Sequence, residues 1–180
     1  MVDYQTIGIL ITATSVTLAA IYYILTVRIN QRNSRITVTN NLMQTLLTEE
    51  AQRRWIDLIN MEWTDYDDYE RKYGSDNNPD NYAKRFSVWS SCNVLGHLLR
   101  KNVADAETFY YAGGQYVIWI WEKFKPVILE HRKRYSTSNA FDGLEYLADE
   151  MLKITRKTDP SYEVPKTFAK YIPEHESVMQ

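Results

Sequence analysis

The fold is decided by Ile7-Gly-Ile-Leu-Ile-Thr-Ala-Thr-Ser-Val-Thr-Leu-Ala-Ala-Ile-Tyr-Tyr-Ile-Leu-Thr-Val27, a run without a charged residue near the N-terminus. As a helix this run would be about 31 Å long at 1.5 Å per residue, close to the thickness of the hydrocarbon core of a bilayer. We therefore expect residues 7–27 to form one transmembrane helix that has the lipid bilayer as its partner. Residues 1–6 would form a short extracytoplasmic N-terminus.

A cleaved signal peptide is the alternative interpretation of this run. Such a peptide begins with basic residues, has a shorter apolar core and ends in small residues at its cleavage site. Here the chain begins with Met1-Val-Asp3, and bulky Tyr22, Tyr23 and Ile24 occupy the region where small residues would precede cleavage. These features favour an uncleaved anchor.

Basic residues lie on only one side of the apolar run. Arg28, Arg32 and Arg35 follow it closely, and no Lys or Arg precedes it. Because basic residues beside a span stay on the cytoplasmic side, the N-terminus should lie outside and the rest of the chain in the cytosol. The expected localisation is therefore the cell membrane, as a single-pass protein. Residues 28–41 would form a basic juxtamembrane linker or a frayed helical stalk.

Small residues line one face of the expected span. Gly8, Thr12, Ser15 and Ala19 recur at helical spacing. Small side chains let two helices approach closely in lipid, and hydroxyl groups can hydrogen-bond across the contact. Self-association or docking on another span is one interpretation. The other is that these residues are ordinary constituents of a single span, with their hydroxyls bonded to their own helix.

Residues 42–154 should form a small helical bundle in the cytosol. The first apolar stripe consists of Met43, Leu47, Ala51, Trp55 and Leu58, spaced as on one face of a helix. Thr48 could cap a fresh start within this stripe, since Glu49 and Glu50 would then lie in the first turn, where the helix dipole favours acids.

Three further amphipathic helices are predicted by the same spacing. Their apolar residues are Phe86, Val88, Trp89, Cys92, Leu95 and Leu99 in the first, Val117, Ile120, Trp121, Phe124 and Ile128 in the second, and Phe141, Leu144, Ala148, Met151 and Leu152 in the third. A short helix should start at Asn102 or Asp105, and Gly113-Gly114 should end it. Pro126 should kink or break the second stripe. Because no long alternating strand pattern occurs, the predicted fold is all-α.

No metal or cofactor motif is present in the sequence. Asp65, Asp67 and Asp68 resemble the start of a calcium loop, but its glycine and glutamate positions hold Glu70 and Asp76, so a solvated acidic turn is expected instead. His97, His131 and His175 lack the spacing of a zinc or di-iron site, and structural roles are expected for His97 and His131. We therefore predict no metal and no cofactor.

Catalytic residues are not identified by any motif. If the protein is an enzyme, Glu107, Glu122 and His97 are the candidates, to be recognised by convergence in a deep pocket. Cys92 is the only cysteine and lies in an apolar context, which indicates a buried packing residue. The chain of 180 residues has a formal net charge of −2, which gives no indication of nucleic-acid binding.

The C-terminal residues 155–180 contain prolines that forbid one continuous helix. We expect this tail to lie outside the bundle. Its apolar residues are Tyr162, Val164, Phe168, Tyr171 and Ile172, which is more than an inert linker needs. The tail is therefore either a docking segment that orders on a partner or a strap that packs back onto the bundle.

One family resemblance is carried by the second half of the bundle. Its residues are Trp121-Glu-Lys-Phe-Lys-Pro-Val-Ile128, Arg132 and Leu144-Glu-Tyr-Leu-Ala148. These elements resemble the C-terminal signature of a prokaryotic family of domains of unknown function, and the similarity extends over roughly residues 28–152. The resemblance implies one N-terminal span, a basic juxtamembrane stretch and a helical cytosolic domain. It implies no activity and no catalytic residues. Relatives often carry Phe where this chain has Leu144.

The sequence therefore predicts a single-pass membrane protein whose helical domain serves as a protein-interaction or scaffolding module at the cytosolic membrane face. The protein partner is not identified. Two alternatives remain: an accessory subunit of a larger membrane complex, and an enzyme without a recognisable motif.

Overall fold

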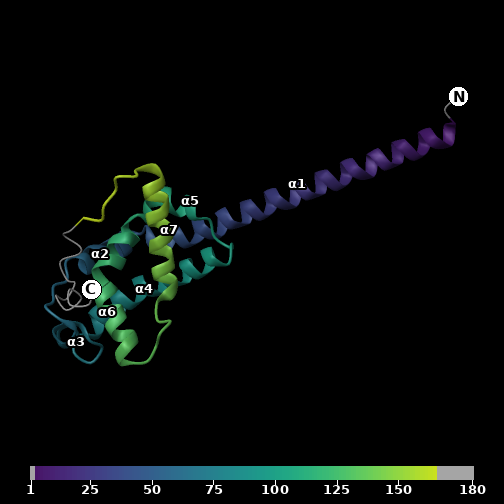
Figure 1. Cartoon of the computed structure of the whole chain (residues 1–180). Helices are drawn as coiled ribbons and strands as arrows, with labels where there is room; N and C mark the ends of the chain where they lie inside the picture. Colours follow the sequence, from purple (N-terminus) through teal and green to yellow (C-terminus); the bar gives the residue numbers. More distant parts are fainter. Residues whose placement is uncertain (1–2, 166–180) are drawn as a thin grey trace, which may run out of the picture.

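The computed structural model of the protein describes residues 3–165, and all regular structure within them is helical. The elements are α1 (Tyr4–Leu46), α2 (Glu49–Ile59), α3 (Tyr66–Tyr73), α4 (Pro79–Arg100), α5 (Ala106–Phe109), η1 (Tyr110–Gly114), α6 (Tyr116–Arg134) and α7 (Asp142–Thr158). This confirms the prediction of an all-α fold in which one long apolar helix precedes a helical bundle (Figure 1).

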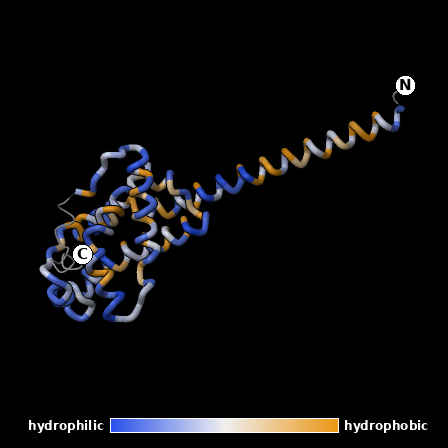
Figure 2. Tube along the Cα trace, viewed as in Figure 1, coloured by the Kyte–Doolittle hydropathy of each residue, from blue (hydrophilic) through white to orange (hydrophobic). Residues whose placement is uncertain are grey.

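Helix α1 projects away from the bundle, with its N-terminal end farthest from it (Figure 1). Residues 3–25 are all exposed, and most of the apolar side chains in residues 4–29 point into open space. The hydropathy of the helix changes from apolar at the far end to polar near the bundle (Figure 2). Residues 28–41, expected to form a linker or a frayed stalk, are part of the same continuous helix.

The C-terminal end of α1 is anchored in the bundle at Thr39. Thr39 is completely buried, and Met43 and Leu46 join the hydrophobic core one and two turns later. The Thr39 hydroxyl accepts a hydrogen bond of 2.8 Å from the Asp105 backbone N–H and donates one to the Arg35 carbonyl. The projecting helix is thus fixed to the loop before α5 by a buried polar contact.

The first predicted amphipathic stripe is divided between two helices. α1 ends at Leu46, and α2 starts after Thr48, whose side chain accepts a hydrogen bond of 3.2 Å from the Ala51 N–H. Such a hydroxyl satisfies one of the backbone N–H groups that a helix start leaves without a partner. Thr48 therefore starts a new helix, as its position before Glu49 and Glu50 predicted.

The acidic residues at 65–68 begin a helix, and of the three only Asp65 and Asp67 are exposed to solvent as expected. Asp65 caps α3 by accepting a hydrogen bond of 2.8 Å from the Asp68 N–H. Asp68 itself is buried, where it pairs with Lys72 at 2.8 Å and with Arg71. The hydrogen bond from Lys72 is the main cause that lowers the Asp68 pKa to about 2. The spacing of Asp68 from two basic residues on the next turn therefore makes it an internal ion-pair partner.

Helices α4 and α7 make the most extensive contact in the bundle. Gly96 on α4 faces Gly143 at the start of α7, and a Cβ atom on Gly96 would lie only 1.7 Å from the Gly143 carbonyl oxygen. The Asn93 side chain accepts hydrogen bonds from the Gly143 and Leu144 N–H groups, which caps α7. Arg100 pairs with Asp142 at 2.8 Å beside this contact.

The segment from α5 to α6 follows the predicted breaks in part. Asp105 caps α5, and Gly113 adopts a φ of 99°, which only glycine adopts readily and which kinks the chain inside η1, before α6 begins. Pro126 neither breaks nor ends α6, which continues to Arg134. The apolar face of α6 is buried at Val117, Ile120, Trp121, Phe124 and Ile128, and this helix forms the centre of the core.

Helix α7 continues beyond the expected end of the domain at residue 154, because Thr155 is buried and bonds to the Met151 carbonyl. After α7, Tyr162 and Val164 pack against the core, and the Trp119 indole N–H lies 3.2 Å from the Tyr162 hydroxyl. This part of the tail is a strap on the bundle. The other apolar residues of the proposed docking segment lie outside the described residues: Phe168, Tyr171 and Ile172.

We predict that Trp121→Ala lowers the free energy of unfolding by about 3–5 kcal/mol, because it removes a large buried side chain from the centre of the core. Urea unfolding of the detergent-solubilised protein, followed by far-UV circular dichroism, measures this change. Tyr111→Ala is the matched control, since Tyr111 is 77% exposed and its loss should change stability by less than about 0.5 kcal/mol. Equal unfolding curves for the Trp121 variant and the parent would place α6 at the periphery.

Gly96→Ala should also destabilise the bundle, by about 2 kcal/mol or more, because the added methyl group collides with the α7 backbone. Val94→Ala on the same helix is the control, since the Val94 side chain is 49% exposed. Melting temperatures of the two variants provide the comparison. Unchanged stability of the Gly96 variant would mean that α4 and α7 are farther apart than described.

Candidate functional site

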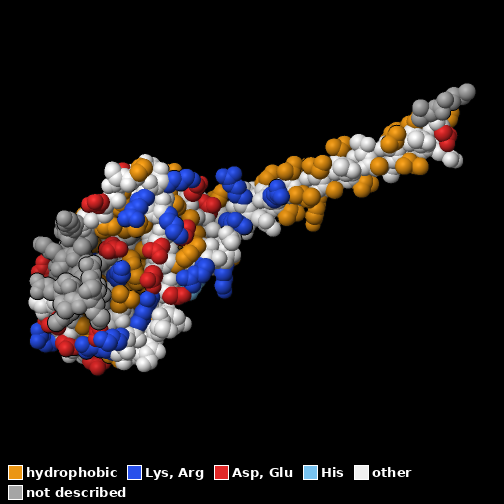
Figure 3. Space-filling model, in the orientation of Figure 1, with side chains coloured by type: hydrophobic (Ala, Val, Ile, Leu, Met, Phe, Trp, Pro, Cys, Tyr) orange, Lys and Arg blue, Asp and Glu red, His pale blue; other side chains and the backbone are white. Residues whose placement is uncertain are grey.

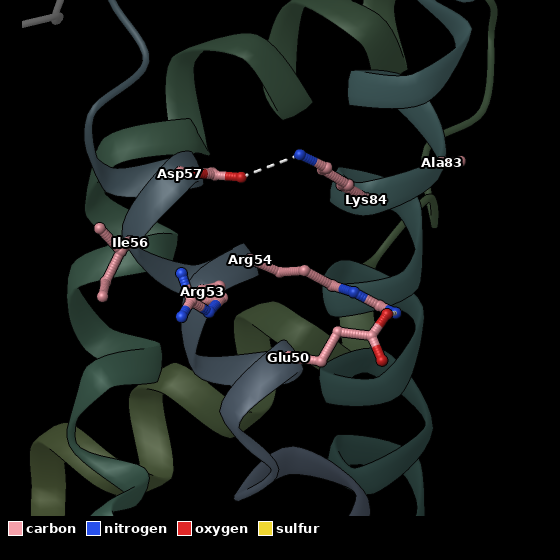
Figure 4. Close-up of a pocket in the computed structure, with 7 residues that line it drawn as sticks. All are labelled: Glu50, Arg53, Arg54, Ile56, Asp57, Ala83 and Lys84. Atoms are coloured by element: carbon pink, nitrogen blue, oxygen red, sulfur yellow. Dashed lines mark hydrogen bonds and ion pairs between the residues drawn. The ribbon is translucent and has the colours of Figure 1, made fainter.

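A charged groove lies between α2 and α4 on the surface of the bundle (Figure 4). Its charges neutralise one another: Lys84 pairs with Asp57 at 3.0 Å, and Arg54 pairs with Glu50. The groove is wide and open to solvent, and exposed ion pairs of this kind contribute little to stability or recognition. The charged side chains of the groove that form these ion pairs are therefore not arranged as a catalytic group.

An aromatic cavity of about 290 Å³ lies on another side of α4, between α3, α4, α6 and the start of α7. Seven aromatic rings supply most of its wall: Tyr66, Tyr69, Tyr82, Phe86, Trp89, Tyr135 and Phe141. Binding cavities for small molecules are mostly apolar and contain a few polar groups that fix the orientation of the ligand. This cavity has that composition.

Arg85 is the cation of the aromatic cavity. It is only 4% exposed, and its guanidinium carbon lies 4.7 Å from the Tyr69 ring centroid, 5.3 Å from that of Tyr82 and 5.2 Å from that of Trp89. Its Nη1 donates a hydrogen bond of 3.1 Å to the Tyr73 carbonyl. Among the described residues no carboxylate forms an ion pair with it. The rings therefore stabilise the charge in place of an anion.

Two further donors belong to the wall around Arg85. The Tyr69 hydroxyl and the Trp89 indole N–H are buried and have no hydrogen-bond partner within the described part of the chain. Burial raises the pKa of the Tyr69 hydroxyl well above its ordinary value, so this group keeps its proton. A buried donor without an acceptor costs free energy, and such groups are rare in folded proteins.

The remaining titratable groups of the cavity are Glu70, His131, Tyr66, Tyr82 and Tyr135. The Tyr66 hydroxyl lies 3.5 Å from Nδ1 of His131, and its pKa is raised by burial and by the nearby Glu70. Burial has the opposite effect on His131, whose pKa it lowers, although the charge of Glu70 opposes this shift. His131 is therefore favoured in its neutral form, and its role at the end of α6 is contact with the cavity wall and with the Tyr135 ring.

Phe141 covers one side of the cavity from an unusual backbone conformation. Its φ of 56° lies in the left-handed region, which is costly for a bulky side chain. The ring nevertheless packs edge-on against Trp89, with 5.2 Å between the ring centroids. The cap that Asn93 places on α7 holds the neighbouring backbone in this position.

Lys123 on α6 is a second buried cation. It is 3% exposed, donates a hydrogen bond to the Ile59 carbonyl and lies over the Trp63 ring at 5.4 Å. Burial lowers its pKa to about 8, and the charge of Glu62 opposes that shift. The carbonyl it contacts belongs to the last turn of α2, so Lys123 ties α2 to α6.

The residues suggested by the sequence for an enzyme do not converge. Glu107 on α5 is exposed, Glu122 on α6 lies outside the aromatic cavity, and His97 on α4 lies 3.3 Å from Asp142. Cys92 is fully buried as expected, and burial raises its thiol pKa to about 12. Within residues 3–165 no group of three or more His, Cys, Asp or Glu side chains is placed to hold a metal ion.

Sequence reasoning missed Arg85 and Lys123. Arg85 is three, four and seven residues before Val88, Trp89 and Cys92, which is the spacing of the buried face of α4. Lys123 follows Ile120 by three residues on the buried face of α6. The signal available in the sequence was the same for both residues: a basic side chain at the helical spacing of an apolar stripe.

We predict that the stability of the parent rises relative to that of Lys123→Met between about pH 8 and pH 10.5. The pKa of Lys123 is lowered to about 8 in the folded protein, whereas it is near 10.5 in the unfolded chain. In this interval the unfolded chain holds a proton that the folded protein has lost, so raising the pH favours folding. Urea midpoints of both proteins at pH 7, 8, 9 and 10 measure the difference.

Other titrating groups, including Cys92, act equally on the two proteins in that comparison and cancel. A stability difference that stays constant over the interval would contradict the lowered pKa of Lys123.

The comparisons with known proteins give one match. A family described as a domain of unknown function, DUF4760, matches residues 10–151. No curated protein and no solved structure matches the chain. The matched segment begins within the apolar part of α1 and ends in α7, so it includes most of the bundle and agrees with the resemblance found in the sequence. Because the match covers most of the chain, this protein belongs to the DUF4760 family of domains of unknown function.

Proposed function

We propose that the protein is a single-pass membrane protein whose helical domain acts as a protein-interaction module at the cytosolic membrane face. The observation that carries the proposal is the continuity of α1. One unbroken helix contains an uncharged, exposed segment long and apolar enough to cross a membrane and a buried end at Thr39 in the bundle. A helix of this kind holds a folded domain close to a bilayer.

The exposed part of α1 suits a hydrocarbon environment. Its large apolar side chains are mostly 40–70% exposed, which is unfavourable in water. Its hydroxyl groups have partners within the helix: Thr12, Thr14, Ser15 and Thr17 each donate to the carbonyl four residues earlier. In lipid every polar group must be satisfied in this way.

Charge supports the proposed orientation. Arg28, Arg32 and Arg35 follow the apolar segment, and basic side chains gather where the projecting helix approaches the bundle (Figure 3). Placing these residues in the cytosol and Asp3 outside satisfies the positive-inside rule. The helical segment from Val27 to Thr39 then sets the bundle about 18 Å from the edge of the hydrocarbon core at 1.5 Å per residue.

The small-residue face of α1 is the proposed contact for a second span. A shallow hollow runs along Gly8 and Thr12, and a Cβ atom on Gly8 would meet nothing within 4 Å. Ser15 and Ala19 continue this face toward the bundle. An identical helix can approach closely along such a face. The same feature would serve an accessory subunit that docks on the span of a larger complex.

We expect a C-terminal reporter that is fluorescent only in the cytosol to be bright in the full-length fusion. Replacing Arg28, Arg32 and Arg35 with Ala and adding three Arg after Met1 should dim it, because the basic residues set the orientation. Lys153→Ala and Lys157→Ala in the domain form the control and should leave the signal unchanged. A dark fusion with activity of a periplasmic reporter at the same site would reverse the topology.

Mass determination in mild detergent tests the interaction module. The protein should form a homo-oligomer or copurify with a stoichiometric partner. Gly8→Ile with Thr12→Ile should shift a homo-oligomer toward monomer, while Ile9→Leu on the same helix should not. A protein that remains monomeric and alone at all concentrations would contradict the proposed function.

A further inference from the structure

We propose that the aromatic cavity around Arg85 binds a small planar monocarboxylate, whose carboxylate pairs with Arg85 and whose apolar body lies between the rings. This inference concerns the bundle interior and is independent of the membrane role. It rests on three features of the same cavity: a buried cation without an acidic partner, two buried donors without acceptors, and a wall of aromatic rings.

Arg85 has unused capacity for an anion. A guanidinium carries five N–H donors in a planar fork, and the contact with the Tyr73 carbonyl uses one nitrogen. The fork matches the two oxygens of a carboxylate, and such paired hydrogen bonds are among the strongest in proteins. Removing a charge from water is costly, and the surrounding rings offset only part of that cost. A carboxylate would supply the missing partner.

The two buried donors point to the same kind of ligand. The Tyr69 hydroxyl and the Trp89 indole N–H belong to the rings that flank Arg85, at 4.7 Å and 5.2 Å from its guanidinium carbon. Both residues are more than nine-tenths buried. Together with the Arg85 nitrogens that the Tyr73 carbonyl does not use, they make a set of donors that a ligand oxygen can satisfy.

The charge of the cavity limits the ligand to a single negative charge. Arg85 is the one permanent cation among the lining residues, and Glu70 adds a carboxylate to the same wall. His131 is favoured in its neutral form by burial. A phosphate monoester, which carries nearly two negative charges at neutral pH, would meet too little positive charge here. A monocarboxylate balances Arg85 alone.

The size and the walls of the cavity define the body of the ligand. A volume of about 290 Å³ equals that of about ten water molecules, which leaves ample room for one six-membered ring with a carboxylate. Tyr82 and Phe86 stack nearly parallel, with 5.7 Å between their centroids, and Trp89 and Phe141 meet edge-on. Aromatic walls of this kind favour a flat ring over a branched chain.

Benzoate is the probe that tests the proposal, with benzamide as its neutral control of the same shape. Isothermal titration of the full-length protein in detergent should give a dissociation constant for benzoate below about 1 mM. Benzamide should bind at least tenfold more weakly, because it lacks the charge that pairs with Arg85. Inorganic phosphate should not bind. Titration into detergent alone corrects for partition of benzoate into micelles.

Two variants locate the site. Arg85→Met keeps the length of the side chain and should weaken benzoate binding at least tenfold. Lys84→Met, at the preceding position but in the charged groove, should leave benzoate binding unchanged. Tyr69→Phe removes only the unpaired hydroxyl and should weaken binding several-fold without loss of thermal stability. It carries the test alone if Arg85→Met does not fold.

The outcomes that overturn the proposal are distinct. They are the absence of benzoate binding to the parent, equal binding of benzamide, a preference for phosphate, or binding that neither cavity variant weakens.

Discussion

Where α4 crosses α7, Gly96 and Gly143 bring the two backbones so close that neither position has room for a Cβ atom. This approach lets the Asn93 side chain cap α7, and it places Phe141 against Trp89 at the edge of the aromatic cavity. The shape of the cavity therefore depends on the close backbone contact between Gly96 and Gly143. Larger residues at either glycine would separate the helices and move one wall of the cavity away from the other.

The bundle also encloses two cations by different means. Lys123 reaches a backbone carbonyl at the end of α2, so its charge stabilises the packing of that helix. Arg85 is surrounded chiefly by aromatic faces and has one carbonyl partner. Lys123, bonded to the main chain, has a structural role. Arg85 faces aromatic rings and unpaired donors in a cavity, so its remaining N–H groups are available to an anion. This difference is the reason for proposing a ligand at Arg85 and a structural role for Lys123.

Much of the architecture could be predicted from the sequence, because it depends on local features. The uncharged run gave α1, helical spacing gave the buried faces of α4 and α6, and Thr48 marked the start of α2 by its own capping chemistry. The site could not be predicted, because it depends on contacts between distant segments. Arg85 was hidden within an apolar stripe, and its ring neighbours come from both α3 and α4. Asp68 was expected to be solvated, although its partners Arg71 and Lys72 lie on the next turn of the same helix.

In the proposed single-pass arrangement, the continuity of α1 has a consequence for how a bilayer would act on the domain. A span longer than the local hydrocarbon thickness tilts to reduce the hydrophobic mismatch. Because no break separates the apolar segment from Thr39, a tilt of the apolar segment also tilts the segment with Arg28, Arg32 and Arg35 and the buried contact at Thr39. In this proposed arrangement, the thickness of the bilayer would therefore set the angle between the bundle and the membrane plane, and with it the face that the bundle presents to the lipid headgroups.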